Sequence, residues 1–162
     1  RSMLERTADA FGYAPAFLGK AGECHNILEQ IKLTVLFVIS TQILGMNIQK
    51  PFDPLLGETF QGYIGGIPVY LEQVSHQPST SLYLMKCESF ELFGCTHPKA
   101  SMHFNSVTGD NVGTMNILFP KTNTKLFCDR PTVEVSGLLY GDRKVKLINK
   151  FHIICEAERL AC

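Results

Sequence analysis

Two short segments of the chain bring together residue types that bind anions. In the first, residues 50–60, Lys50 is followed by two prolines three positions apart, Pro51 and Pro54. Each proline fixes its own φ and forces extended backbone at the residue before it. The segment is therefore predicted to be a stiff elbow that fixes the direction of Lys50. A plain connector between a helix and a strand, with a solvated lysine, is the alternative interpretation.

The second segment, residues 72–79, is a strand-like run that ends in a polar turn. It holds His76 and Gln77 between two serines, and Pro78 stops the strand. Side-chain donors gathered at a strand end suit an anionic, oxygen-rich group, because several charge-assisted hydrogen bonds can converge on it. A histidine satisfied by hydrogen bonds within its own turn explains the same residues, and this alternative stays open.

Neither segment predicts catalysis. Ser75 and His76 are neighbours on a predicted strand, so their side chains point to opposite faces. The Gly-x-Ser-x-Gly pattern of a hydrolase nucleophile is also absent. Six cysteines, at positions 24, 87, 95, 128, 155 and 162, include no Cys-x-x-Cys pair. They are expected to be buried, reduced thiols rather than zinc ligands, with Cys95, His97 and His103 as a remote alternative. We expect no catalytic residue, no metal and no cofactor.

The composition excludes several classes of protein. The chain has 162 residues, 45% apolar and 19% charged, and its 15 basic and 15 acidic residues give no net charge. This apolar content is too high for a disordered chain, and a nucleic-acid-binding protein needs a basic surplus. The longest uncharged stretch, residues 33–49, holds too many polar residues for a transmembrane span. No signal peptide opens the sequence, so a cytoplasmic location is expected; both ends look cut, which predicts a fragment.

The first part of the chain, about residues 1–46, is predicted to be helical. Apolar residues recur at helical spacing from Met3 to Phe11, and Gly12 and Pro15 then break or kink the run. Another helix is expected to begin at Asn26 as its N-cap, with Glu29 in the capping-box position, and to end at Gly45. This helix is apolar on most of its faces, which predicts that a sheet covers it.

The rest of the chain, about residues 59–162, has the pattern of short antiparallel strands. Gly65 and Gly66 predict a two-residue hairpin between residues 60–64 and 67–75. Turns are expected at Pro78, at Gly94 and at residues 108–110, among others. The predicted strands are residues 81–87, 100–105, 113–119, 132–140 and 144–150. Their spacing predicts an α+β fold, mainly antiparallel, whose curved meander forms part of a barrel.

These segments resemble the signatures of the ligand-binding domain of the oxysterol-binding-protein-related family. In that family the first reads Lys-Pro-Phe-Asn-Pro-Leu-Leu-Gly-Glu-Thr, against Lys-Pro-Phe-Asp-Pro-Leu-Leu-Gly-Glu-Thr from Lys50 here. The second reads Glu-Gln-Val-Ser-His-His-Pro-Pro, against Glu-Gln-Val-Ser-His-Gln-Pro-Ser from Glu72. The likeness extends outward to residues 2–5, 13–18, 119–122 and 135–141. It covers nearly the whole chain, so residues 1–162 are expected to be a single, partial domain of this kind.

The resemblance implies a curved sheet that encloses a tunnel for one lipid, a sterol or a phosphoinositide, with helices at one end. It implies Lys50 and His76 as contacts of the phosphoinositide headgroup. Asp53 and Gln77 stand where the family has an asparagine and a second histidine. A carboxylate cannot donate a hydrogen bond to phosphate, and Gln77 donates without a charge. The inward-facing wall is expected to include some of Leu82, Leu84, Val133, Val135 and Leu147, for which ordinary core packing is the alternative.

The function implied by the resemblance is lipid binding and transfer between membranes, with no chemical conversion. Its partners would be a sterol, phosphatidylinositol 4-phosphate and membrane surfaces, without nucleic acid. The expected location is cytoplasmic, peripheral to the endoplasmic reticulum and its contact sites. The alternative is a lipid-sensing or scaffold module that lacks the lid and part of the barrel and does not transfer lipid.

Overall fold

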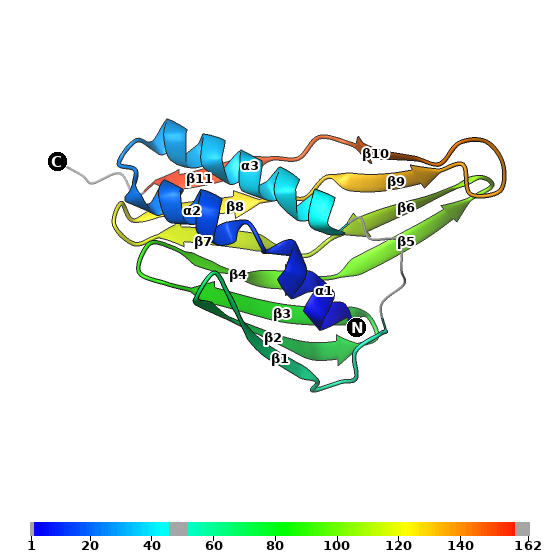
Figure 1. The fold of residues 1–162 in the computed structure, drawn as a ribbon, viewed down its shortest axis with the longest axis horizontal. Helices are drawn as coiled ribbons and strands as arrows, with labels where there is room; N and C mark the ends of the chain where they lie inside the picture. Colours follow the sequence, from blue (N-terminus) through cyan, green and yellow to red (C-terminus); the bar gives the residue numbers. More distant parts are fainter. Residues whose placement is uncertain (1, 46–51, 158–162) are drawn as a thin grey trace.

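The computed structural model describes residues 2–45 and 52–157, in which three helices are followed by antiparallel strands (Figure 1). The predicted Lys50 lies outside the described residues. The helices are α1 (Met3–Ala10), α2 (Ala14–Glu23) and α3 (Ile27–Gly45). The strands are β1 (Thr59–Ile64), β2 (Ile67–His76), β3 (Ser79–Lys86), β4 (Glu91–Thr96), β5 (Pro98–His103), β6 (Ser106–Asn111), β7 (Met115–Phe119), β8 (Thr124–Cys128), β9 (Thr132–Ser136), β10 (Lys144–Ile148) and β11 (Ile153–Ala157).

The helices follow the local signals in the sequence. The backbone N–H of Leu28 donates to Oδ1 of Asn26 over 2.9 Å, which confirms Asn26 as the N-cap of α3. Glu29, which was predicted in the capping-box position, pairs with Lys32: its Oε2 lies 3.4 Å from Nζ of Lys32. The predicted break after Phe11 is confirmed, but the chain resumes a helix at once. Pro15 lies in the first turn of α2, where its missing N–H leaves no hydrogen bond unmade.

The strands form one continuous meander that is divided into two sheets. One sheet has the order β1-β2-β3-β4-β7-β8-β11, and the other has the order β10-β9-β6-β5. Strands β4 and β5, β6 and β7, β8 and β9, and β10 and β11 are successive in the chain, and each pair runs from one sheet into the other (Figure 1). Every neighbouring pair is antiparallel. The described strands leave both sheets open, which confirms the predicted incomplete barrel.

Several sequence-based boundaries were wrong. The predicted turns at Gly94 and at residues 108–110 lie inside β4 and β6. A Cβ at Gly94 would overlap the carbonyl oxygen of Thr114, so glycine marks a close approach of two strands here and not a turn. The hairpin at Gly65 and Gly66 is confirmed, with φ values of 56° and 82° and Ile64 paired with Ile67.

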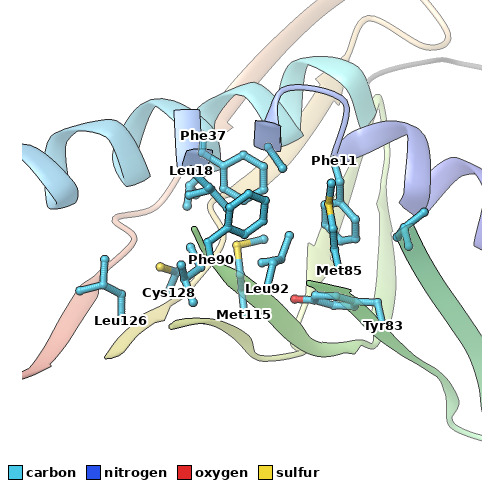
Figure 2. Packing of buried hydrophobic residues seen from close by; sticks show 14 of the residues in the cluster. Phe11, Leu18, Phe37, Tyr83, Met85, Phe90, Leu92, Met115, Leu126 and Cys128 are labelled. Atoms are coloured by element: carbon cyan, nitrogen blue, oxygen red, sulfur yellow. The ribbon is translucent and has the colours of Figure 1, made fainter. Parts of the chain in front are cut away.

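The helices pack on one face of the seven-stranded sheet and form the core. Figure 2 shows Phe11, Phe37 and Phe90 between the helices and the strands. The rings of Phe11 and Tyr83 lie 4.9 Å apart between centroids. Buried and exposed residues alternate along β2 and β3, so the core takes every second side chain of these strands. The predicted sheet cover for α3 is therefore confirmed.

A half-buried arginine, Arg130, contacts the buried Tyr83 where the two sheets separate. Nη2 of Arg130 donates to the hydroxyl of Tyr83 over 3.1 Å, and its guanidinium lies 5.7 Å from the ring centroid. That hydroxyl donates to the carbonyl oxygen of Thr114 over 3.0 Å. Burial raises the pKa of Tyr83, although the charge of Arg130 opposes the shift. The phenol therefore stays protonated, and it joins β3 to the residue before β7 and to the connection between β8 and β9.

The cysteines are less buried than predicted. Cys24, Cys87, Cys95, Cys128 and Cys155 are free thiols, as expected, but only Cys128 among them is fully buried. Burial raises the pKa of Cys128 to about 12, so its thiol stays protonated at neutral pH. The described residues contain no group of three side chains arranged to hold a metal ion. Among them no helix is both long and apolar enough to cross a membrane.

Two glycines of α2 give a test of the helix packing. A Cβ at Gly22 would overlap the carbonyl oxygen of Ser89 in the turn between β3 and β4, whereas a Cβ at Gly19 meets nothing. Gly22→Ala is expected to lower the free energy of unfolding by about 1–3 kcal/mol, since backbone must move. Gly19→Ala is expected to raise it by up to about 1 kcal/mol through helix propensity. Urea unfolding measures both variants, and equal stabilities would contradict this packing.

Candidate functional site

The two motif segments meet at the backbone of Gln73. Its carbonyl oxygen accepts from the N–H of Gly57 over 2.8 Å, and its N–H donates to the carbonyl oxygen of Glu58 over 2.9 Å. Gly57 belongs to the predicted elbow, and Gln73 lies three residues before His76 in β2. The elbow therefore runs directly into the start of β1 alongside the last part of β2.

The elbow has its own hydrogen-bonded turn. Oε2 of Glu58 accepts from the N–H of Leu55 over 3.0 Å, and the N–H of Glu58 donates back to the Leu55 carbonyl oxygen over 2.9 Å. Gly57 has a φ of 80°, which a side chain would disfavour. At the other end, the N–H of Met3 donates to the carbonyl oxygen of Phe52 over 3.0 Å. These bonds confirm a defined elbow over residues 52–58.

The side chain of Gln73 holds the turn that carries His76 and Gln77. Its Nε2 donates to the carbonyl oxygen of Ser75 over 2.7 Å and to Oγ of Ser79 over 3.0 Å. The hydroxyl of Ser81 donates to its Oε1. Gln73 is fully buried, so each of these bonds replaces one that water would have supplied. One side chain thus fixes both ends of the turn.

His97 joins the same turn to the second sheet. Its Nδ1 lies 2.9 Å from the carbonyl oxygen of Ser79 and 3.3 Å from Oγ1 of Thr80. Because the carbonyl can only accept, the geometry fits a proton on Nδ1. The backbone N–H of His97 donates to Oδ1 of Asn111 over 2.9 Å. The turn after β2 therefore lies beside the start of β5.

Three of the predicted site residues lie on the two segments that meet at Gln73. Asp53 lies on the elbow, His76 ends β2 and Gln77 follows it, and all three side chains are exposed. None of the three makes a side-chain hydrogen bond within residues 2–45 and 52–157. Lys50 precedes the described part of the elbow by two positions. The structure brings the two segments together and leaves the side chains of Asp53, His76 and Gln77 exposed.

The four-stranded sheet continues from this corner with an apolar face. The register places Met102 opposite Val107, and Val135 opposite both Val107 and Val145. Leu147 lies opposite Val133 on the same face. These side chains are exposed or half-buried, and α3 ends near the point where this sheet begins (Figure 1). The described helices therefore leave this apolar face uncovered.

This apolar face continues the helix-covered side of the other sheet. Leu92 and Thr96 are buried on that side of β4, and only His97 separates β4 from β5. Side chains alternate along extended backbone, so Ala100 and Met102 fall on the same side as Thr96. The predicted wall residues Val133, Val135 and Leu147 belong to this surface.

A hollow lies on the side of the seven-stranded sheet opposite the helices. It has a volume of about 780 Å³, and Leu82, Leu84 and Phe93 contribute to its lining. Glu72 and Glu91 are among its lining residues, and Glu91 forms an ion pair with Lys86. The carboxylate of Glu72 would repel a phosphate. Leu82 and Leu84, predicted as wall residues, thus face this outer hollow, since they alternate with Tyr83 and Met85 of the core.

Gln73 and His97, which hold the turn after β2, are not among the residues predicted from the sequence. Gln73 follows Val69 and Leu71 at alternate positions of β2, so a polar residue on the buried face was the signal. His97 has no comparable signal, because its partners Ser79 and Thr80 come from another strand.

Comparison with known proteins agrees with the motifs. The family described as "Oxysterol-binding protein" matches residues 1–162. Oxysterol-binding protein 9 of Dictyostelium discoideum is 34% identical over 165 residues, which cover 100% of this chain and 38% of that protein. The protein OBPalpha of Candida albicans is 29% identical, over 99% of this chain and 39% of its own. The chain belongs to the oxysterol-binding protein family and spans about two fifths of the length of these relatives.

Solved structures show the same fold. The ORD of Osh3 from Saccharomyces cerevisiae, in complex with PI(4)P, has a TM-score of 0.84 and 26% identity. The match covers 95% of this chain and 42% of that one. The Osh1 ORD domain in complex with cholesterol has a TM-score of 0.86 and 25% identity, with 95% of this chain and 38% of that one covered.

Replacement of Gln73 tests its role at the site. Gln73→Leu leaves the hydroxyls of Ser79 and Ser81 without the amide as a partner. The free energy of unfolding should therefore fall by about 1–3 kcal/mol. Gln61→Leu, at an exposed position of β1, is the matched control and should change stability little. Hydrogen exchange at residues 75–80 should also become faster in Gln73→Leu alone. Unchanged exchange there would show that the amide does not hold the turn.

Proposed function

We propose that this chain binds a lipid whose headgroup lies at the corner formed by the elbow and the turn after β2. The observation that carries the proposal is the set of bonds at Gln73, which joins the two segments. Lys50 and His76 would supply charge to a phosphate, and Gln77 would supply an uncharged donor. His76 and Gln77 lie on the one turn that Gln73 holds, which favours contacts of both side chains with the same phosphate.

The apolar part of the lipid would lie on the open face of the four-stranded sheet. The contact of His97 with Ser79 supports this position, because it holds the turn after β2 beside the start of β5, where that face begins. Burial of apolar surface contributes roughly 25 cal/mol per Å², so uncovered valines and leucines favour an acyl chain or a sterol. The solved relatives Osh3, with PI(4)P, and Osh1, with cholesterol and with ergosterol, support these two ligand classes.

The carboxylate of Asp53 changes which side chains would bind the phosphate. A carboxylate on the elbow adds negative charge near a phosphate and donates no hydrogen bond. The family asparagine at this position would donate one. The headgroup contacts of this chain would therefore rest on Lys50 and His76 more than on the elbow side chain.

We further propose that the bound lipid is exchanged between membranes without chemical conversion. A bilayer interior and an apolar protein face are alike in polarity, so exchange needs little net free energy. The place of action would be cytoplasmic, at endoplasmic reticulum contact sites. A lipid-sensing or scaffold module that holds its lipid without transferring it is the alternative. That residues 1–162 form one partial domain stays a prediction.

The headgroup role is tested with Lys50→Ala combined with His76→Ala. The double variant should extract phosphatidylinositol 4-phosphate from liposomes at least about tenfold less well, because two charge-assisted contacts are lost. Lys20→Ala with His25→Ala removes the same side-chain types from exposed positions in and after α2 and is the matched control. Extraction equal to that of the unmodified chain would reject the headgroup role.

The apolar face is tested separately with Val135→Gln. A polar side chain in the middle of this face should weaken binding of a fluorescent sterol roughly tenfold, since buried apolar contact is replaced by an unpaired amide. Glu134→Gln, on the neighbouring position and the opposite face of β9, should leave sterol binding unchanged. If both variants bind alike, the sterol does not lie on this face.

A further inference from the structure

Two hairpin tips at the far end of the four-stranded sheet expose large apolar side chains. Phe104, between β5 and β6, is 79% exposed, and Leu139 and Tyr140, between β9 and β10, are 71% and 60% exposed. The rings of Phe104 and Tyr140 lie 5.9 Å apart between centroids, edge to face. We call these three residues the tip cluster. Both tips lie at the right end of Figure 1, beyond the end of α3.

The two tips are held together by polar contacts of Asn105. Its Nδ2 donates to the carbonyl oxygen of Tyr140 over 2.9 Å, and its Oδ1 accepts from the N–H groups of Leu139 and Tyr140 over 2.8 and 3.3 Å. Its own carbonyl oxygen accepts from the N–H groups of Gly137 and Leu138. Asn105 therefore holds the two tips together through polar contacts to the backbone.

Glycines support the same rigid shape. Gly137 and Gly141 have φ values of 77° and 86°, and a Cβ at Gly137 would overlap the carbonyl oxygen of Asp142. The loop after β9 is thus built to hold Leu139 and Tyr140 outward. Large apolar groups on a rigid, protruding tip lose little entropy on binding, which favours association with another phase or surface.

The charges around the tips select the kind of partner. Arg143 and Lys144 are exposed and follow Tyr140 by three and four positions, and His103 precedes Phe104. Asp142 is the acidic residue among them, so the tip region has a basic excess. Apolar tips with a tyrosine and with basic residues behind them match the interface of an anionic bilayer. There tyrosine lies at headgroup level and lysine and arginine meet the lipid phosphates.

We propose that the tip cluster is a docking surface for an anionic phospholipid bilayer. Phe104 and Leu139 enter the interface, Tyr140 lies at headgroup level, and Arg143 and Lys144 attract the surface charge. This surface is formed by the tips alone and uses neither the headgroup corner nor the apolar wall at Val133 and Val135. Docking here is therefore separate from lipid binding in the proposed site.

The chain contains no tryptophan, so one introduced indole reports on one position. Phe104→Trp should shift its emission to shorter wavelength when vesicles of phosphatidylcholine with a minor fraction of phosphatidylserine are added. Brominated lipid in the same vesicles should quench it. Tyr63→Trp, 79% exposed on β1 at another part of the surface, is the matched reporter and should show neither effect. Added salt should weaken the response by screening.

Sedimentation with the same vesicles measures the strength of docking. Phe104→Ser with Leu139→Ser should lower the partition coefficient at least about tenfold, because two apolar side chains no longer enter the interface. Tyr63→Ser is the control. Because these vesicles hold no phosphoinositide and no sterol, Lys50→Ala with His76→Ala should still sediment normally. If Lys50→Ala with His76→Ala still sediments with these vesicles, the tips bind the bilayer without the headgroup site, and the two proposals can fail independently.

Three results would overturn the docking proposal. The first is that the Phe104→Trp emission does not respond to vesicles. The second is that this emission is already shifted before vesicles are added, which means that a second copy or another protein surface covers the tips. The third is that the serine double variant sediments like the unmodified chain while its circular dichroism spectrum is native. If that variant fails to fold, the tryptophan reporter still decides.

Discussion

The geometry of the candidate site depends on one buried amide, that of Gln73. A buried primary amide is costly unless its donors and acceptor find partners. The partners it finds are the turn after β2 and the start of β3, while its backbone holds the elbow. The position of the exposed site residues is thus coupled to the core, because the turn cannot shift without leaving this amide unpaired. A rigid polar corner on an otherwise apolar scaffold results.

The division of the meander into two sheets has a functional consequence. Helices cover one face of the seven-stranded sheet, where Phe11, Phe37 and Phe90 close the core. Beyond the Arg130–Tyr83 junction the strands continue, but the described helices do not. Leu92 in β4 and Met102 in β5 lie on the same side of the strands, because side chains alternate between the two faces. Leu92 is therefore buried under the helices, whereas no described helix covers Met102. An apolar molecule that covers a face of this kind lowers the free energy of the system, and the proposed headgroup corner lies at the edge of this face.

Membership of the oxysterol-binding protein family accounts for the fold, and the departures from its motifs concern chemistry more than shape. Asp53 and Gln77 change what the corner offers to a phosphate, yet Pro54, Gly57 and Glu58 keep the elbow in place. The turn retains its shape because Gln73 holds its backbone and Ser79 accepts from that amide. The serine that replaces the second proline of the motif thus takes part in the network.

The sequence by itself determined the local elements and the family. Asn26 caps a helix, Gly65 and Gly66 make a hairpin, and alternation marks half-buried strands, because each signal acts between residues close in the chain. It failed at Gly94, where glycine serves a close approach of strands and not a turn, and at residues 108–110, which lie inside β6. Tertiary structure alone decided that Leu82 and Leu84 face an outer hollow, and that His97 contacts the turn at Ser79. It also decided that Asn105 unites two hairpin tips, since these contacts join residues 18 to 35 positions apart, whose meeting depends on strand order and register.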